Sequence, residues 1–376
     1  MTSVFYLYRD APRRRRALQA PPGSAERYAL YGLDQLAERG FRVRHNLERR
    51  PPGWARLAGA ALQRALLHAG GYGGDFAAAL ASLRAANRAD VVFSTVDTVG
   101  IPLALLARLG LVRRPFVYTA IGLPERLERL RGERLRRLYA DALGRAAAIV
   151  AYSEHEAAVL RAWLAERGAA PPVEFVPFGV DPEAFRPDGR PADLDVVSAG
   201  ADPHRDFELL LQVAERLPET RFHLVAEAER ARALPALPAN VALEADLPFE
   251  ALRDRLARAR VVALPVRENS YSGATTVLLQ AMALGKPVVV TRTRAITAGY
   301  GLRDGENCRL VPPGDAATLE KALRHVLADG WHARALGASA RRTVERELSW
   351  ERYADRLAAI IAGAAGAPRD GRSARA

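Results

Sequence analysis

Short apolar runs alternate with segments of helical periodicity along the whole chain. In the first half, such runs predict strands at 3–8, 41–45, 90–95, 115–120, 147–153 and 173–179. In the second half, they predict strands at 195–200, 221–226, 241–245, 260–265, 287–291 and 308–312. This alternation is typical of parallel sheets that carry helices on both faces.

Apolar positions spaced three and four residues apart predict the helices between these strands. In the first half, we expect helices at 25–39, 75–87, 101–110, 125–145 and 154–167. In the second half, we expect them at 206–217, 249–258, 274–284, 315–328 and 331–346. The segment 49–74, which is rich in Ala, Arg and Gly, is compatible with a helix followed by a loop.

A proline-rich, charged stretch without periodicity interrupts the alternation near the middle of the chain and predicts a linker at 183–194. We therefore expect domains at 1–182 and 195–348, then a helix at 349–366 and a disordered tail at 367–376. The predicted fold class is α/β, with two doubly wound, Rossmann-like domains that face one another across a cleft. Ligands of such sheets bind at the carboxyl ends of the strands.

Composition fits a globular protein with two cores, since the chain has 376 residues and 49% hydrophobic content. No apolar run approaches the roughly 20 residues of a membrane span. The first residues are apolar ahead of a run of arginines, the reverse of a signal peptide, and Cys308 is the single cysteine. We therefore expect a cytoplasmic location.

The net charge of +12 lies mostly in the first half and is carried almost entirely by arginine. It is compatible with an acidic partner and equally with a solubilising surface. The predicted helix at 125–145 carries seven arginines, so contact with the inner face of an anionic membrane is possible, as is a merely solvated face. No basic patch interleaved with aromatic residues is present, and we expect no nucleic-acid partner.

A loop of small residues opens the predicted helix at 274–284. It contains Ser272, Gly273, Ala274, Thr275 and Thr276. Small side chains at a helix N-terminus let an anion approach unpaired N–H groups, so a phosphate or diphosphate is a candidate ligand; an ordinary Ser/Thr N-cap is the alternative.

One polar residue, Gln280, lies inside this otherwise apolar helix. Its amide would either hydrogen-bond ligand hydroxyl groups or be solvated.

A second strand, turn and helix follows residue 195, with Gly200, His204 and Arg205 in the turn. Gly200 permits a close approach to the backbone, and Arg205 can hold a phosphate through its planar fork of donors. The alternative is a surface arginine capped by Asp206.

Weaker candidates lie in the first half. Gly23 and Ser24 precede a predicted helix, whereas Thr119 and Gly122 follow the fourth strand. We expect these four residues on the acceptor side of a cleft. The Asp193-Leu194-Asp195 pattern lies at the amino end of a strand, and the histidines show no ligand spacing, so we predict no metal site.

Four motifs in this order resemble the group 1 (family 4) glycosyltransferases of the GT-B fold. They are "VEFVPFGVDPEAFRP", similar to the family's interdomain signature; "LLQAMALGKPVVVT", its donor-site helix and strand; "DGENCRLVPPGD", its late hairpin; and "LSWERYADRL", its closing helix, which crosses back to the first domain.

This resemblance implies transfer of a sugar from a nucleotide-sugar donor to an acceptor hydroxyl, with retention and without a metal or other cofactor. In the family, a basic residue after the Gly of the first strand holds the donor diphosphate; its counterpart here is Arg205, after Gly200. Amides of the loop at 272–276 would hold phosphate and sugar, which makes Arg205 and Ser272 the predicted catalytic residues. Stabilising the charge of the leaving diphosphate is the main chemical task.

The chain departs from the family pattern at two positions that carry glutamates eight residues apart. They fall on Ser272 and Gln280, and a second basic residue falls on Ala201. These departures leave open a catalytically reduced protein that binds a sugar nucleotide, or a sugar-nucleotide epimerase on the same fold. The acceptor is open among a glycan, a lipid-linked sugar and a natural product.

Overall fold

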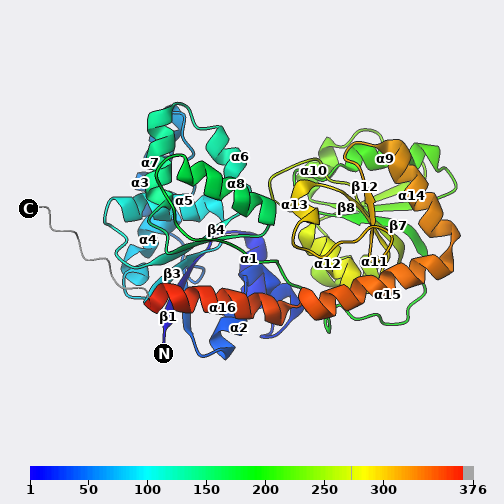
Figure 1. The fold of residues 1–376 in the computed structure, drawn as a ribbon, viewed down its shortest axis with the longest axis horizontal. Coiled ribbons are helices and arrows are strands. Elements are labelled where there is room, and N and C mark those ends of the chain that lie inside the picture. The colour runs from blue at the N-terminus through cyan, green and yellow to red at the C-terminus, as the bar shows by residue number, and fades with distance from the viewer. Residues whose placement is uncertain (272, 367–376) are drawn as a thin grey trace, which may run out of the picture. The chain divides into compact units, whose positions relative to one another are not determined.

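The computed structural model describes residues 1–271 and 273–366 in two compact units (Figure 1). Unit 1 contains residues 1–152, 156–176 and the described residues from Ala354 onward. Unit 2 contains residues 153–155 and 177–353. In this part of the chain, no helix has both the length and the apolar character needed to cross a membrane.

The described strands of unit 1 form one parallel sheet of six strands in the order β2-β1-β3-β4-β5-β6. Their bounds are β1 Ser3–Leu7, β2 Arg42–His45, β3 Val91–Ser94, β4 Phe116–Ala120, β5 Ala148–Ala151 and β6 Val173–Phe175. The chain runs from β1 outward to β2 and then returns to pair β3 with the other edge of β1, in the register Val4↔Val91. The direction of strand order therefore reverses between β1 and β3, the place where such sheets bind ligands.

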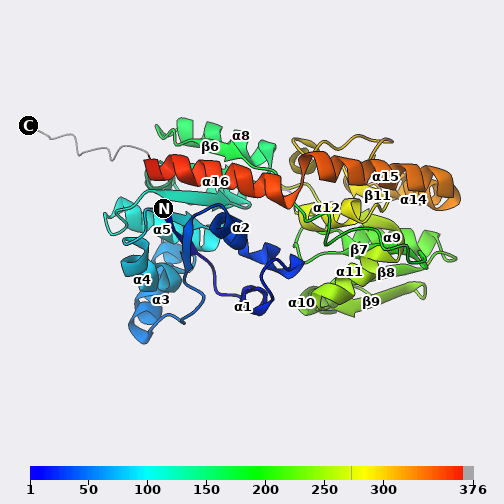
Figure 2. The same ribbon diagram turned by 90° about the horizontal axis from the view of Figure 1, so that it is seen from below.

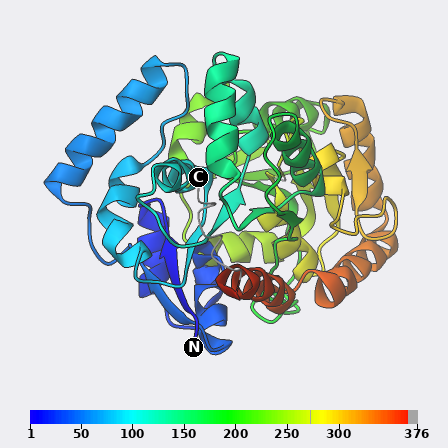
Figure 3. The same ribbon diagram turned by 60° about the vertical axis from the view of Figure 1, so that its left-hand side comes forward.

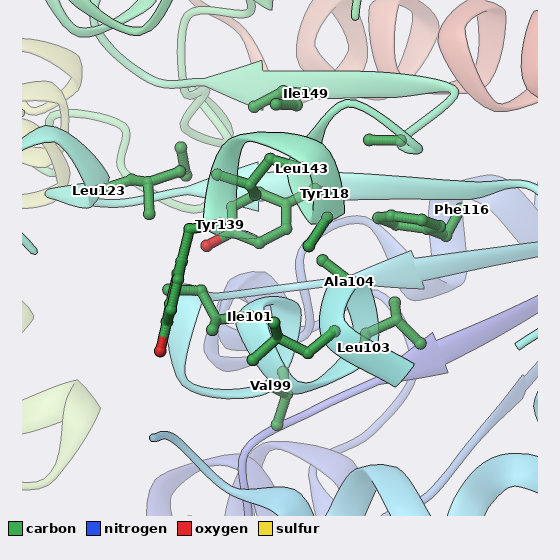
Figure 4. Packing of buried hydrophobic residues seen from close by; sticks show 14 of the residues in the cluster. Val99, Ile101, Leu103, Ala104, Phe116, Tyr118, Leu123, Tyr139, Leu143 and Ile149 are labelled. Carbon is green, nitrogen blue, oxygen red and sulfur yellow. The ribbon is translucent and has the colours of Figure 1, made fainter. Parts of the chain in front are cut away.

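The helices of unit 1 cover this sheet. Their bounds are α1 Pro12–Gln19, η1 Ala25–Leu30, α2 Leu33–Glu38, α3 Gly53–His68, α4 Phe76–Ala86, α5 Asp97–Arg108, α6 Leu123–Glu128, α7 Glu133–Leu143, α8 Glu154–Ala165 and α16 Trp350–Gly366; the first residues of α8 and α16 belong to unit 2. Buried side chains of α5 and α7 interlock with those of β4 and β5, as for Tyr118, Tyr139 and Ile149 (Figure 4). Burial of this apolar surface is the main term that holds the unit together.

The described strands of unit 2 form a second parallel sheet of six strands, in the order β12-β11-β10-β7-β8-β9. Figure 2 shows β7, β8 and β9 of this sheet side by side. Their bounds are β7 Leu194–Ala199, β8 Phe222–Ala226, β9 Val241–Ala245, β10 Ala259–Leu264, β11 Val288–Thr291 and β12 Arg309–Val311. The order reverses between β7 and β10, which pair in parallel. The loops after these two strands therefore lie side by side at the carboxyl edge.

The helices of unit 2 are α9 Phe207–Arg216, α10 Ala228–Ala233, α11 Phe249–Ala257, α12 Thr275–Ala283, α13 Arg294–Thr297, α14 Ala316–Ala328 and α15 Gly330–Glu347. Helices α9 and α14 pack on each other over a buried cluster that includes Phe207 and Leu323. Helix α12 contacts both α11 and α15.

Each predicted strand has a counterpart among the described residues, but several helices differ from the prediction. The helix expected at 25–39 is broken at Tyr31 and Gly32, both left-handed, and the helix expected at 125–145 is broken at Gly132, which has φ 80°. Helix α1 was not predicted because its "PRRRRALQ" sequence has no apolar periodicity and buries only Ala17. The uncertain segment at 49–74 contains α3.

The late motif is not a hairpin. Residues Arg303–Cys308 form a tight loop in which Arg303 N–H donates to Asn307 Oδ1 at 2.7 Å, and β12 then pairs in parallel with β11. The predicted tail at 367–376 lies outside the described residues.

Candidate functional site

The two loops that follow β7 and β10 are tied together at the point where the strand order of unit 2 reverses. Arg205 and Val266 form an isolated antiparallel bridge. The N–H of Asp206 donates to Pro265 O at 2.9 Å, and the N–H of Arg267 donates to His204 O at 2.8 Å. These bonds hold the predicted diphosphate loop against the loop that leads into α12.

Arg205 is a buried cation in this pair of loops, with 1% of its surface exposed. Its Nη2 donates to Ala199 O and to Ser198 Oγ, whereas Nε and Nη1 have no hydrogen-bond partner among the described residues. Burial lowers the pKa of Arg205 to about 10, so the side chain stays charged at neutral pH. The alternative of a surface arginine is therefore wrong; Asp206 instead caps α9, accepting from Leu209 N–H at 3.3 Å. A buried guanidinium with two unpaired nitrogens is suited to an anion.

Gly200 lies directly against this guanidinium. A Cβ at Gly200 would come 2.6 Å from Arg205 Nε, closer than any side chain can tolerate. The sequence predicted that a group would approach the backbone closely at Gly200, and in the structure this group is the side chain of Arg205.

Three side chains form a polar cluster where the two loops face each other. Tyr271 Oη donates to Asp202 Oδ2 at 2.7 Å and lies 3.1 Å from His204 Nδ1. The N–H of His204 donates to Asp202 Oδ1 at 2.8 Å. His204 is therefore engaged with Asp202 and Tyr271, and Asp202 and Tyr271 are site residues that sequence reasoning missed.

The small loop ahead of α12 places a helix N-terminus at the same edge. Ala274 is the N-cap and forms no side-chain cap, so neither described threonine occupies the N-cap position. Thr275 is buried and Thr276 is half-buried. Ser272, the other predicted catalytic residue, lies outside the described residues. Backbone N–H groups in the first turn of α12 remain suited to an anionic ligand.

Gln280 is buried inside α12, with 3% of its surface exposed, so the interpretation as a solvated side chain is wrong. We find no hydrogen bond from its amide within the part of the chain that the structure describes. A ligand hydroxyl group could pair with this amide.

The predicted acceptor-side residues of unit 1 lie in two separate places. Gly23 and Ser24 connect α1 to η1, and Gly23 takes φ 77°. Thr119 is fully buried in β4, and its hydroxyl has no partner among the described residues. Gly122 caps α6 with φ 74°. None of the hydrogen bonds among the described residues joins the first pair to the second.

Two buried carboxylates hold the loop after β4, and sequence reasoning missed both. Asp97 follows β3 at the point where the strand order of unit 1 reverses; it accepts from Tyr118 Oη at 2.7 Å and from Arg126 Nε at 3.2 Å. Glu156 Oε1 accepts from Gly122 N–H at 2.7 Å and from Leu123 N–H at 3.1 Å. The available sequence signal was a carboxylate soon after a predicted buried strand, since Asp97 follows β3 and Glu156 follows β5.

Desolvation shifts the pKa values of both carboxylates upward. The pKa of Asp97 rises to about 6 through burial, against the opposing effect of Arg126. The pKa of Glu156 rises to about 8 through burial and the nearby charge of Asp97. Glu156 is therefore largely protonated at neutral pH.

No group of His, Cys, Asp and Glu side chains among the described residues could hold a metal ion. Asp193 and Asp195 bind arginines instead: Asp193 Oδ2 lies 2.6 Å from Arg258 Nη2, and Asp195 Oδ1 lies 2.8 Å from Arg260 Nη1.

Comparison with known proteins places this architecture in a family. Two Rossmann-like units, each with a parallel sheet whose order reverses, define the GT-B class. The family model "Glycosyltransferase Family 4" matches residues 25–184, and "Glycosyl transferases group 1" matches residues 195–329. The chain belongs to the group 1, family 4 glycosyltransferases.

Curated relatives match the chain in part. An MMP α-(1→4)-mannosyltransferase of Mycolicibacterium hassiacum is 31% identical over 50% of this chain and 47% of its own length. A GDP-mannose-dependent monoacylated α-(1-6)-phosphatidylinositol monomannoside mannosyltransferase of Corynebacterium glutamicum is 26% identical over 54% of this chain and 59% of its own. The chain thus spans about half the length of the curated relatives it matches.

Solved structures share the fold over nearly the whole chain. Sucrose-phosphate synthase of Thermosynechococcus elongatus has a TM-score of 0.72 and 19% identity, and the match covers 96% of this chain and 98% of the synthase chain. Anabaena HepE, solved with UDP and glucose, has a TM-score of 0.68 and 14% identity, covering 96% of this chain and 99% of its own.

Proposed function

We propose that the protein transfers a sugar from a nucleotide-sugar donor to an acceptor hydroxyl, with retention of configuration and without a metal or other cofactor. The observation that carries the proposal is Arg205, a buried cation with two unpaired guanidinium nitrogens at the sheet edge where α12 begins. Family membership and the mannosyltransferase relatives support it.

The donor diphosphate would lie between Gly200, Arg205 and the first turn of α12. A positive side chain and a helix N-terminus both stabilise the charge that builds on a departing diphosphate. These groups of the chain itself could take the role that a divalent cation has in other transferases, which supports the metal-independent part of the proposal. Gln280 would hydrogen-bond the donor's hydroxyl groups from inside the same helix.

Nucleotide binding tests the donor site. We expect UDP, GDP, TDP or ADP to raise the melting temperature of the wild-type protein, because a ligand that binds only the folded state stabilises it. Arg205→Lys should weaken this binding because an ammonium cannot reproduce the planar fork of donors. Arg216→Ala, at the exposed end of α9, is the matched control. Failure of every nucleotide diphosphate to bind the wild type would refute the proposal.

Turnover distinguishes the alternatives on the same fold. The absence of a glutamate at Gln280 favours a catalytically reduced protein, which would bind a sugar nucleotide but neither transfer nor hydrolyse it. An epimerase would interconvert donor sugars without an acceptor. Transfer that survives a chelator and preserves the anomeric configuration, followed by NMR, is the result that supports the proposal.

The acceptor is proposed only by class: a glycan, a lipid-linked sugar or a natural product. A lipid-linked acceptor is supported by α3, which forms a blue helix at the periphery of unit 1 and packs on α4 (Figure 3). Trp54 and Leu57 share one face of α3, with exposures of 59% and 76%, and Arg56 and Arg64 are also exposed. This composition suits peripheral contact with an anionic membrane.

Vesicle sedimentation tests this contact. Binding to vesicles that contain anionic lipid should exceed binding to neutral vesicles, and Trp54→Ser with Leu57→Ser should abolish the excess. Equal binding by the variant would exclude α3 as the membrane contact while leaving the donor site unaffected.

A further inference from the structure

A basic pocket lies at the opposite end of α12 from the candidate donor site. It has a volume of about 340 Å³ and is formed by the 187–190 segment, the turn between α12 and β11, and α15. Helix α15 packs against α12 (Figure 1). The charged side chains that line it are Asp188, Arg190, Lys286, Arg334 and Arg341. Four cationic side chains and one carboxylate thus line this cavity, which we call the α12–α15 pocket.

Two of the four cations already have partners. Arg190 lies 2.8 Å from Asp188 and 2.6 Å from Asp254. Arg341 pairs with Glu345 at 2.7 Å, and its Nη1 donates to Ala283 O at 2.6 Å. Arg341 therefore satisfies the carbonyl end of α12, where a cation is favoured by the helix dipole.

The other two cations, Lys286 and Arg334, have no such structural role. Within residues 1–271 and 273–366, neither Lys286 nor Arg334 forms an ion pair. Lys286 is half-buried, and burial lowers its pKa, with only a partial opposing effect from Asp188. Asp188 is already paired with Arg190, so half-buried Lys286 and exposed Arg334 add positive charge to the pocket that no ion pair among the described residues offsets.

We propose that the α12–α15 pocket binds a phosphate monoester through Lys286 and Arg334. A guanidinium fork and an ammonium point charge are the usual pair for phosphate oxygens. The volume lies at the lower end of small-molecule sites, so it suits a small phosphorylated compound or the phosphate headgroup of a lipid. This site is separate from the donor site, at the other end of a helix about 13 Å long.

Lysine labelling tests the site directly, because Lys286 and Lys321 are the only lysines in the chain. The probe is pyridoxal 5′-phosphate with borohydride reduction, followed by peptide mass mapping. We expect Lys286 to label faster than the exposed Lys321, and millimolar inorganic phosphate to slow labelling of Lys286 by about fivefold at matched ionic strength, as for a ligand present at about four times its Kd. Labelling of Lys321 should not change. Equal protection of both lysines, or of neither, would overturn the proposal.

Thermal shift gives a second readout that does not depend on the label. Glycerol 3-phosphate should stabilise the wild type and the Lys321→Gln control but not Lys286→Gln/Arg334→Gln. The shift should persist in saturating nucleotide diphosphate; its loss there would assign the phosphate to the donor site and refute a separate pocket. Binding to phosphatidate vesicles that also depends on Lys286 and Arg334 identifies a lipid headgroup as the source, whereas a response to glycerol 3-phosphate alone identifies a free compound.

Discussion

The carboxylate of Asp202 lies directly against Gly273. A Cβ added to Gly273 would come 2.7 Å from Asp202 Oδ1, and Tyr271 Oη holds the other carboxylate oxygen at 2.7 Å. The small loop ahead of α12 therefore accommodates an aspartate of the neighbouring loop. The sequence alone left a phosphate ligand and an ordinary Ser/Thr N-cap as the two explanations of this smallness.

The first prediction follows from this contact. Gly273→Ala should force Asp202 away and misplace the loop, weakening nucleotide diphosphate binding by about tenfold, or about 1.4 kcal/mol. Asp202→Ala in the same chain should restore much of the affinity because it removes the clashing oxygen. Isothermal titration of the two single variants and the double variant measures the coupling. Strictly additive effects would show that Asp202 and Gly273 do not interact in the binding state.

The fold was more predictable than the site because the two depend on different features of the sequence. Strands buried on both faces appear as continuous apolar runs, and every predicted strand has a counterpart. A helix break such as that at Gly132 depends on a single residue with positive φ, and the apolar periodicity of a long segment does not reveal it. The pairing of Asp202 with Tyr271 joins residues 69 positions apart and has no local signal.

The same distinction applies to burial within the site. The turn after β7 predicted Arg205 as a phosphate ligand, but the structure was needed to show that this side chain is buried and packs on Gly200. Gln280 was recognised as unusual in an apolar helix, and its burial decides against a solvated role.

The second prediction concerns this glutamine. Gln280→Glu should lower the melting temperature of the ligand-free protein, because a carboxylate would be buried without a counter-charge. Nucleotide sugar should then stabilise the variant more than the wild type, since a carboxylate accepts ribose hydroxyls more strongly than an amide does. Gln212→Glu, on the exposed surface of α9, should change neither quantity. An unchanged donor-induced shift would place Gln280 away from the donor.

The third prediction concerns the packing of α15 on α12. A Cβ at Gly337 would lie 2.0 Å from the carbonyl oxygen of Gly285, a backbone atom that cannot move aside without displacing the helix end. Gly337→Ala should therefore destabilise the protein by about 2–3 kcal/mol in thermal unfolding. Gly363→Ala is the control: with open space around it in α16, it should stabilise by up to about 1 kcal/mol. Equal effects of the two substitutions would contradict the close packing.

The fourth prediction is a pH dependence of stability set by Glu156. Its pKa is about 8 in the folded protein and about 4.3 in an unfolded chain, so between these values the folded state holds a proton that the unfolded state has lost. Stability from this group is therefore present in acid and is lost as the pH rises through about 8. Asp97, with a pKa of about 6, adds a similar loss at lower pH.

Glu156→Gln keeps an oxygen that can accept from Gly122 and Leu123 but cannot ionise. The melting temperature of the variant should therefore fall less than that of the wild type between pH 6 and pH 9, a window that brackets the Glu156 pKa of about 8. The gap should reach a few degrees, corresponding to about 1–2 kcal/mol. Glu166→Gln, at an exposed position, should follow the wild-type curve. Parallel curves for Glu156→Gln and the wild type would mean that Glu156 ionises normally, and the loop after β4 would then be held by a charged carboxylate at neutral pH.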